Sequence, residues 1–281
     1  MKYIILLILT ISFVAVQSSD NIKFQLKSNP KITAEYEGSI KNGKAHGQGK
    51  AIFYLGTEYD GEYEGEWIDN DFHGYGSFKW KNGSKYIGKF EFSKRNGEGE
   101  FTWPNGNSYK GEWKDGVQHG QGTHKWTNGE KYSGVYINGE QTGLGIYSWP
   151  NGDTYDGYWL NGEQHGQGTF VFSSGDKYVG SFTNNDRNGF GTFYWSNGNV
   201  YKGEWSNNSQ SGQGTKTWSS GNKYEGSWLN DNFHGKGTYT WNDGDKFIGH
   251  FENGKRSGDG RMEFANGTIQ EGKYINDVFQ Q

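Results

Sequence analysis

Aromatic residues and glycines alternate with polar residues along almost the whole chain, and the alternation returns at a constant interval. Nine copies of the pattern begin with aromatic residues that are spaced 23 residues apart (86 − 63 = 23, for example). The nine are Tyr63, Tyr86, Tyr109, Tyr132, Tyr155, Tyr178, Tyr201, Tyr224 and Phe247. An earlier copy begins at Tyr36, and a partial copy begins at Gln270. A constant interval of this length indicates a repeat protein.

Within each copy the large residues and the glycines keep the same places. We number the positions from one to 23, starting at the first aromatic residue. Position one is aromatic in all ten copies, position five in all but the first (Ile40), and position eighteen is always Phe or Trp. Glycine occupies positions three, twelve, fourteen and twenty-one of every copy, and all 12 tryptophans fall at positions five and eighteen.

The spacing predicts two strands for each copy. Positions one, three and five alternate with polar residues, and so do positions fourteen, sixteen and eighteen, as expected of half-buried strands. A helix is excluded, because so much glycine would break it. An Asn-Gly or Asp-Gly pair such as Asn128-Gly129 recurs before position twenty-two and predicts a hairpin turn. Positions six to eleven are expected to form a polar loop joining the two strands.

An isolated hairpin is marginally stable in water, so the copies must pack against one another. The predicted fold is all-β: an elongated, twisted, single-layer antiparallel sheet of tandem 23-residue hairpins. One face would carry Tyr, Trp and Gly, and the other, with positions two, four, thirteen, fifteen and seventeen, would be solvated. The insertion Tyr59–Glu62 predicts a longer strand or a local bulge. Ile22, Phe24 and Leu26 alternate and predict a strand that caps the edge.

The N-terminus differs from the rest of the chain. Lys2 precedes an apolar run from Tyr3 to Val16, followed by small and polar residues. This pattern predicts a secretory signal peptide over residues 1–18, since the run is shorter than the ~20 residues of a membrane span. An uncleaved membrane anchor is the alternative. We therefore expect a capping segment at 19–35, ten full repeats and a partial one over 36–281, and a product in the secretory pathway or outside the cell.

The composition and charge of the chain argue against several classes of function. The net charge is −4, with acidic and basic residues mixed along the chain, which argues against nucleic-acid binding and against simple attraction to anionic lipid. The absence of cysteine excludes disulfides, thiolate catalysis and cysteine-type zinc sites. Aromatic residues make up 17% of the chain, which argues against disorder.

The residues that could suggest a metal, phosphate-binding or catalytic site are better explained by structural roles. Five of the seven histidines share position eleven, but neighbouring repeats would hold them roughly 10 Å apart, two strand spacings, too far to share a metal ion. They are His46, His73, His119, His165 and His234. The Gly-x-Gly pairs lack the Lys-Ser/Thr of a phosphate loop, and the acidic pair Glu64 and Glu66 lies on a solvated face. We expect no catalytic residue, metal or cofactor. Asn82, Asn207 and Asn266 begin glycosylation sequons.

The motif itself resembles a known repeat. Tyr109-x-Gly111-x-Trp113, then Gly120-x-Gly122, then Trp126-x-Asn128-Gly129 is similar to the MORN (membrane occupation and recognition nexus) motif, and the resemblance covers residues 36–281. It implies an elongated sheet of hairpins. It also implies a scaffold or adaptor, often at membranes, cilia, the cytoskeleton or cell-division structures. Many members are cytosolic, whereas this chain begins with an apparent secretory signal.

The function expected from these observations is a non-enzymatic scaffold. It would bind a protein partner or a second copy of itself, or assemble at a membrane-associated structure, through its aromatic face. The residues predicted to contact the partner are Tyr109, Trp113, Trp126, Tyr132, Trp149, Tyr155 and Trp159. The alternative is a surface module that binds glycans or lipids in the secretory pathway.

Overall fold

The structure, a computed structural model, describes residues 20–280. The predicted signal peptide, residues 1–18, lies outside this range. The described residues form 23 strands and no helix, so residues 20–280 include no helix that could cross a membrane. The chain divides into two compact units between Pro104 and Asn105, and each is described by itself.

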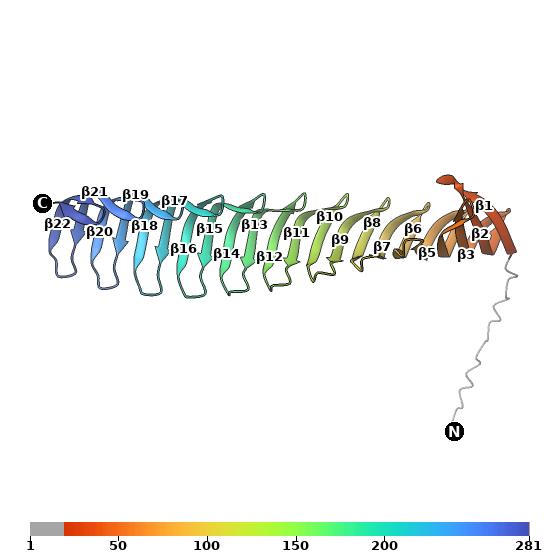
Figure 1. The fold of residues 1–281 in the computed structure, drawn as a ribbon, viewed down its shortest axis with the longest axis horizontal. Coiled ribbons are helices and arrows are strands. Elements are labelled where there is room, and N and C mark those ends of the chain that lie inside the picture. Colours follow the sequence, from red (N-terminus) through yellow and green to blue (C-terminus); the bar gives the residue numbers. More distant parts are fainter. Residues whose placement is uncertain (1–19, 281) are drawn as a thin grey trace, which may run out of the picture. The chain divides into compact units, whose positions relative to one another are not determined.

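The first unit is an antiparallel sheet in which every strand pairs with the next one along the chain (Figure 1). Its strands are β1 (Asp20–Leu26), β2 (Asn29–Lys41), β3 (Lys44–Leu55), β4 (Glu58–Ile68), β5 (Asp71–Trp80), β6 (Lys85–Glu91) and β7 (Lys94–Thr102).

The second unit repeats the same arrangement, with each strand paired to its neighbours in the chain. Its strands are β8 (Ser108–Lys114), β9 (Val117–Lys125), β10 (Lys131–Ile137), β11 (Glu140–Ser148), β12 (Thr154–Leu160), β13 (Glu163–Val171), β14 (Lys177–Thr183), β15 (Asp186–Tyr194), β16 (Val200–Ser206), β17 (Ser209–Thr217), β18 (Lys223–Leu229), β19 (Asn232–Thr240), β20 (Lys246–Glu252), β21 (Lys255–Glu263), β22 (Ile269–Ile275) and β23 (Val278–Gln280). The predicted all-β class and the antiparallel sheet of tandem hairpins are confirmed.

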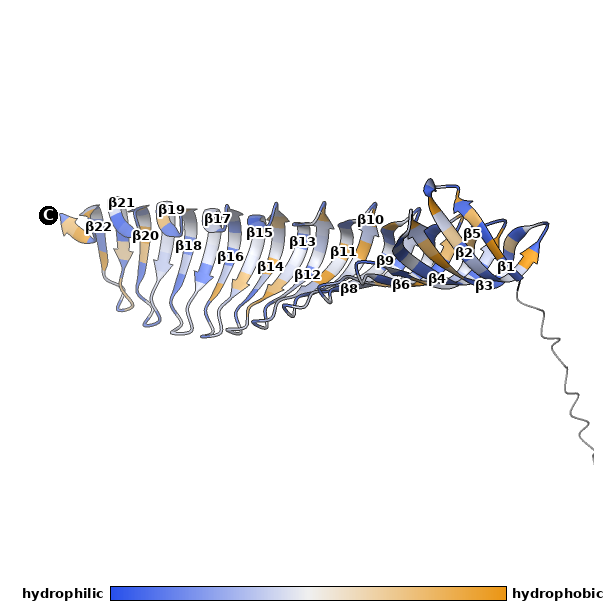
Figure 2. Ribbon diagram, turned by 45° about the vertical axis from the view of Figure 1, so that its right-hand side comes forward, coloured by the Kyte–Doolittle hydropathy of each residue, from blue (hydrophilic) through white to orange (hydrophobic). Residues whose placement is uncertain are grey.

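Strands β2 to β5 are longer than the other strands of the first unit. β3 has 12 residues and β4 has 11, because the insertion extends the hairpin, and their register shifts between Phe53 and Tyr54. The predicted longer strand and the predicted bulge are therefore both present. β1 pairs with β2 as the expected capping strand, and its Phe24 ring lies 6.0 Å from that of Trp67. Hydrophobic and hydrophilic residues alternate along these strands (Figure 2).

Two-residue turns join the strands of each hairpin, at positions seven and eight. Between β8 and β9 the turn is Asp115-Gly116, with φ of 50° and 88°. The first turn position is Asn or Asp in all the other full repeats but one, and in that one, between β6 and β7, it is Phe92. Short polar side chains tolerate this left-handed backbone, which the primed hairpin turns require. The predicted loop over positions six to eleven was wrong, because the second strand already resumes at position nine.

The recurring Asn-Gly pair lies in a different connection. It belongs to a five-residue loop that joins one repeat to the next, closed by the bonds from Trp126 N to Glu130 O (2.9 Å) and from Gly129 N to Trp126 O (3.0 Å). Asn128 Oδ1 accepts a hydrogen bond from Glu130 N at 3.0 Å. The predicted hairpin turn is therefore present, since the loop joins the paired antiparallel strands β9 and β10, but it is a five-residue loop between repeats, and Gly129 supplies its positive φ of 94°.

A bulge in the second strand of each hairpin lets neighbouring turns bond to each other. In β8 and β9, Gly111 pairs with Gly122 but Trp113 pairs with Gln118, so three residues of β9 face one residue of β8. The next turn then donates a hydrogen bond from Gly139 N to Gln118 O at 2.8 Å. Each later turn of the second unit is tied in the same way to the bulged strand of the repeat before it.

Candidate binding face

Side chains at positions one, five, ten and sixteen share one face of the sheet, here called the ring face. The position-one ring of every full repeat is buried. Tyr155 illustrates why: its hydroxyl donates a hydrogen bond to Tyr158 O at 3.0 Å, and its ring lies flat over Gly157 and Gly168, which pair across the hairpin. A β-carbon on Gly168 would overlap the phenol. The two glycines therefore make the seat for the ring.

Position-five rings connect the repeats. The ring of Tyr155 meets Trp159 of its own repeat edge-on at 5.2 Å and Phe182 of the next repeat at 5.0 Å. Equivalent pairs recur through the second unit, and each contributes about 0.5–1.5 kcal/mol beyond the burial of its area. Each hairpin is therefore held by the rings of its neighbour, as expected for a hairpin that is not stable alone.

The buried phenols are structural groups. Burial raises the pKa of Tyr132 and of Tyr178 to about 12. Both hydroxyls stay protonated at neutral pH and act only as hydrogen-bond donors, to Val135 O and Ser181 O respectively.

Position ten covers the position-one ring from above. Phe233 stacks on Tyr224 with ring centroids 3.9 Å apart, and the guanidinium of Arg187 lies 5.8 Å from the Tyr178 ring. Glutamine occupies the same position in four other repeats of the second unit, as Gln118, Gln141, Gln164 and Gln210. Sequence reasoning missed these residues because it placed position ten in a loop. Extending the alternation backwards from position fourteen would have found them.

Positions sixteen and eighteen form a second line of rings beside the buried ones. Neighbouring centroids are 4.5 Å apart for Tyr147 and Trp149, 5.3 Å for Trp149 and Phe170, and 4.5 Å for Phe170 and Phe172. We call this line in the second unit the ring row: His124, Trp126, Tyr147, Trp149, Phe170, Phe172, Phe193, Trp195, Lys216, Trp218, Tyr239 and Trp241. All but Phe193 are half-buried, so the row keeps part of its apolar surface accessible.

The seven residues predicted to contact a partner divide between the two lines. Five are buried within the sheet: Tyr109, Trp113, Tyr132, Tyr155 and Trp159. The other two, Trp126 and Trp149, lie half-buried in the ring row. The surface that a partner could reach is therefore the ring row rather than positions one and five. Binding itself stays a prediction.

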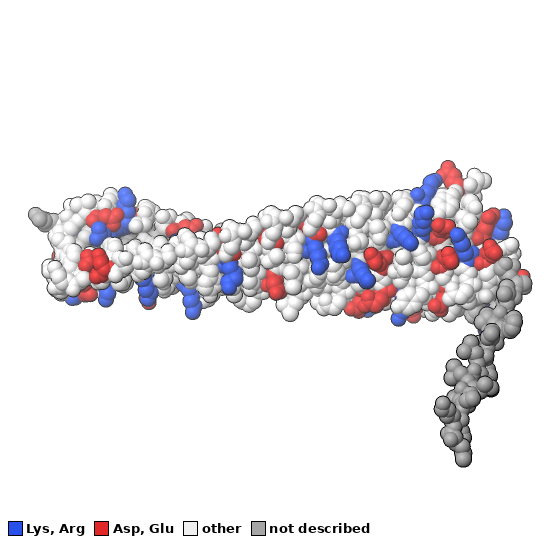
Figure 3. Space-filling model, turned by 90° about the horizontal axis from the view of Figure 1, so that it is seen from below, with Lys and Arg blue, Asp and Glu red and all other residues white. Residues whose placement is uncertain are grey.

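The opposite face is solvated, as predicted, but it is not uniformly polar. Leu144 and Tyr158 pair across β11 and β12 with exposed fractions of 68% and 41%. Basic and acidic side chains are interspersed rather than separated in Figure 3. No large area of one charge results on the face drawn.

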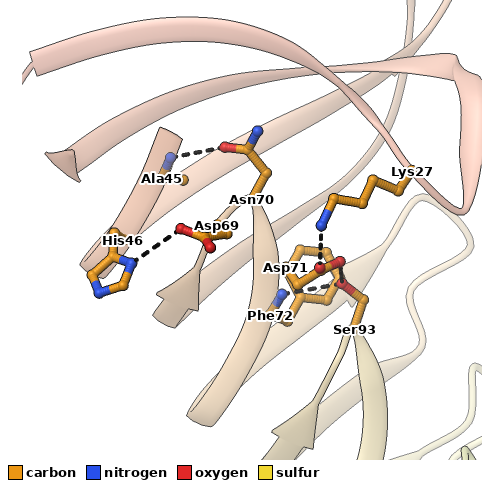
Figure 4. Close-up of polar contacts among 8 residues, drawn as sticks. All are labelled: Lys27, Ala45, His46, Asp69, Asn70, Asp71, Phe72 and Ser93. Atoms are coloured by element: carbon orange, nitrogen blue, oxygen red, sulfur yellow. Dashed lines mark hydrogen bonds and ion pairs between the residues drawn. The ribbon is translucent and has the colours of Figure 1, made fainter. Parts of the chain in front are cut away.

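Polar contacts tie the turns of the first unit together (Figure 4). Lys27 Nζ lies 2.7 Å from Asp71 Oδ2. Ser93 Oγ donates a hydrogen bond to Asp71 Oδ1 at 2.9 Å and accepts one from Phe72 N at 3.1 Å. Asn70 Oδ1 accepts from Ala45 N at 2.8 Å. Each side chain here bonds to a neighbouring turn, which is a structural role.

The position-eleven histidines show no arrangement for metal binding. His46 Nδ1 lies 3.5 Å from Asp69 Oδ1, and within residues 20–280 no group of three or more His, Cys, Asp or Glu side chains could hold an ion together.

Comparison with known proteins identifies one family, and two of the solved structures with a similar fold are described below. The MORN repeat profile matches ten segments, at 36–54 and then in nine consecutive blocks from 63–85 to 247–269. No curated protein matches the chain. The SAS-4 (dCPAP) TCP domain of Drosophila melanogaster, solved with a proline-rich motif of Ana2 (dSTIL), is 12% identical, with 55% of this chain and 85% of that chain covered and a TM-score of 0.36. A mutant TCP10 domain of Danio rerio CPAP is 10% identical, with 90% and 99% covered and a TM-score of 0.32. At these TM-scores neither likeness bears on function.

Proposed function

The chain belongs to the MORN-repeat family, and we propose that it is a non-enzymatic scaffold whose ring row binds an extended segment of a protein partner. One observation carries the proposal: half-buried rings follow one another without a gap from Trp126 through Trp149 to Phe172, across the strands of the second unit. Continuous apolar surface that a sheet leaves accessible usually marks an interaction site.

The period of the row suits an extended polypeptide. Equivalent residues of successive repeats are two strands apart, about 9.6 Å. A polyproline II segment rises ~3.1 Å per residue and has three residues per turn, so it repeats every ~9.3 Å. A peptide lying along the row would present the same kind of side chain to each repeat. Of the glutamines at position ten, Gln118 and Gln141 are half-buried and offer amide groups for its backbone, whereas Gln164 and Gln210 are buried.

Other occupants fit less well. A second copy of the chain would have to present a strip complementary to the row, and its exposed residues such as Leu144 lie on the opposite face. A glycan could stack on single rings, but it would not use their regular spacing. An anionic membrane surface is disfavoured by the mixed charge (Figure 3).

The test is selection of random sixteen-residue peptides, displayed on phage, against the full-length chain. The affinity of the selected peptides is then measured for the variant Trp149→Ala/Trp195→Ala. Because both rings are half-buried, the variant is assayed below its own unfolding midpoint, and Trp149→Phe serves as a variant that keeps a ring. Position eighteen is Phe at Phe172 and Phe264, so this change suits the fold.

We expect micromolar binders that lose about tenfold or more in affinity to the double variant and retain affinity for Trp149→Phe. The matched control is Tyr158→Ala/Val179→Ala on the opposite face, where both side chains are 41% exposed. Binders that prefer neither face, or that depend on Tyr158, would contradict the proposal. If the parent chain dimerises and the tryptophan variant does not, the occupant of the row is a second copy of the chain. If the parent chain binds selected members of a glycan array, the protein is a glycan-binding module.

A further inference from the structure

Two cations interrupt the ring face of the second unit, at Arg187 on β15 and Lys216 on β17. Neither side chain has a carboxylate within ion-pairing distance among residues 105–280. The comparable Arg256 on β21 is neutralised, with its Nε 3.1 Å from Asp277 Oδ1. Arg187 and Lys216 therefore differ from Arg256 in having no carboxylate at ion-pairing distance among residues 105–280.

Lys216 stands where most repeats have a ring. Its ammonium lies 4.6 Å from the Trp195 ring centroid and 5.5 Å from that of Trp218, so it bridges two members of the ring row. Burial lowers the pKa of Lys216, and its Nζ makes no hydrogen bond to the described part of the chain. An ammonium has three donors, and here they remain for a ligand or water.

Arg187 lies over three rings, the nearest being Trp205 at 4.5 Å from the guanidinium carbon. The guanidinium donates two hydrogen bonds to Asn208, from Nη2 to the backbone oxygen at 2.8 Å and from Nε to Oδ1 at 3.3 Å. Both acceptors are uncharged. A guanidinium has five N–H groups, so most of its donors are left over.

The two cations lie over adjacent rings. The guanidinium of Arg187 is 5.3 Å from the Phe193 ring, the ammonium of Lys216 is 4.6 Å from the Trp195 ring, and these two rings are 4.6 Å apart. Asp231, in the turn between β18 and β19, attracts both, but burial outweighs it and the pKa of each cation is lowered. Asp231 Oδ1 accepts a hydrogen bond from Gln210 N at 2.8 Å, and the carboxylate forms no ion pair with either cation among residues 105–280. The patch thus holds two partly desolvated positive charges among rings, a setting in which a carboxylate from outside would be bound strongly.

We propose that the ring face across β15 to β17 takes an aspartate or glutamate side chain of the partner segment, attracted by Arg187 and Lys216, while apolar residues on either side lie on the flanking rings. This inference rests on the proposed function and adds the chemistry of the partner: an extended apolar segment with an acidic residue near its centre.

The repeats themselves supply test variants that suit the fold. Arg187→Gln introduces the residue that position ten has at Gln164 and Gln210, and Lys216→Tyr introduces the one that position sixteen has at Tyr147 and Tyr239. The probe is the same random peptide library, selected on the full-length parent chain and on the double variant in parallel. Arg256→Gln, which removes the ion-paired arginine, is the matched control.

We expect the peptides selected by the parent to be enriched in Asp and Glu, and those selected by Arg187→Gln/Lys216→Tyr not to be. A synthetic parent-selected peptide should bind the double variant about tenfold more weakly, and Arg256→Gln as tightly as the parent. Replacing its acidic residue by the amide should weaken binding to the parent but not to the double variant, which isolates the pair.

The two proposals fail in different ways. Peptides that need Trp149 and Trp195 but show no acidic enrichment, or that bind the double variant equally well, would overturn the acidic-residue inference alone. If no selected peptide depends on Trp149 and Trp195, the proposed function fails, and this inference fails with it.

Discussion

The ring of Tyr155 occupies the space that a side chain on Gly168 would need, since a β-carbon there would overlap the phenol. The hydroxyl is also tied to Tyr158 O, so the ring cannot easily swing away. We expect Gly168→Ala to lower the free energy of unfolding by about 1–3 kcal/mol, as overpacking does, measured by urea denaturation. Thr169→Ala, the next residue and on the opposite face, should change it by no more than ~0.5 kcal/mol. Equal effects of the two changes would contradict the conclusion that Gly168 is needed to leave room for the Tyr155 ring.

A glycine at a turn should behave in the opposite way. Gly162 has a φ of 81° and open space where its β-carbon would be, and its backbone N donates to Gln141 O at 2.9 Å. At the same position in the next repeat, Asn185 makes that bond and also accepts one from Gln164 N at 2.9 Å.

We therefore expect Gly162→Asn to raise the free energy of unfolding by about 0.5–1.5 kcal/mol, the net contribution of one hydrogen bond. Gly162→Ala is the control: it meets the same positive φ without gaining the acceptor, so it should destabilise. The measurement is again the urea unfolding curve, and a Gly162→Asn variant no more stable than the parent would refute the turn-to-turn bond.

The repeat period was enough to predict the buried layer of the fold. Positions one, three and five alternate without interruption, so Tyr155, Gly157 and Trp159 could be placed on one face of a strand from their spacing alone. The turns could not be located in this way. Asn128-Gly129 and Asp115-Gly116 are both turn-forming pairs, and only long-range pairing decides which closes the hairpin and which leads to the next repeat.

The candidate binding surface was predicted less well for a related reason. Sequence reasoning selected the aromatic residues of the middle repeats, which include Tyr155 and Trp159, residues that packing buries almost completely. Which rings stay accessible depends on which side chains cover them. The side chain at position ten covers the position-one ring, and it can be as different as Phe233, Gln164 and Arg187. Because the residue type varies, the sequence did not reveal that this position has the same place in every repeat.

Acid should weaken the links between the five-residue loops. Asp153 and Asp176 accept backbone hydrogen bonds from Ser173 N and Ser196 N, both at 2.7 Å, and these bonds lower the pKa of each carboxyl. Because the folded pKa is below the unfolded value of ~3.9, the stabilisation is complete above that pH and is lost as the pH falls through the folded pKa.

We expect Asp153→Asn/Asp176→Asn to lose less stability than the parent when the pH is lowered from about 5 to about 2. The amide keeps the acceptor oxygen, as Asn199 does with Ser219 N at 3.0 Å. Urea midpoints across this range compare the two proteins. Identical pH slopes would mean that other carboxylates dominate the acid response.

Entry into the secretory pathway is a separate prediction, made from residues 1–18. Expression of the full chain with a C-terminal tag in eukaryotic cells should give a product that lacks these residues and begins near Ser19. Mass spectrometry of the purified protein reads its N-terminus directly, and a variant with Leu6→Asp/Leu7→Asp should retain it, because the apolar run is broken. A cytosolic product of the parent chain with its N-terminus intact would show the prediction to be wrong.

Phe92 occupies a turn position at which the other hairpins have Asn or Asp. Its φ of 47° is costly for a bulky residue, and its side chain is 68% exposed, so little packing offsets the strain. We expect Phe92→Asn to raise the free energy of unfolding by about 1 kcal/mol or more, by relieving a backbone strain of order 1–3 kcal/mol. The reciprocal change, Asn138→Phe, should lower it by a similar amount, because Asn138 has nearly the same φ of 53°. If both substitutions left the urea midpoint unchanged, the turn would be indifferent to its first residue, and the recurrence of Asn and Asp there would need another cause.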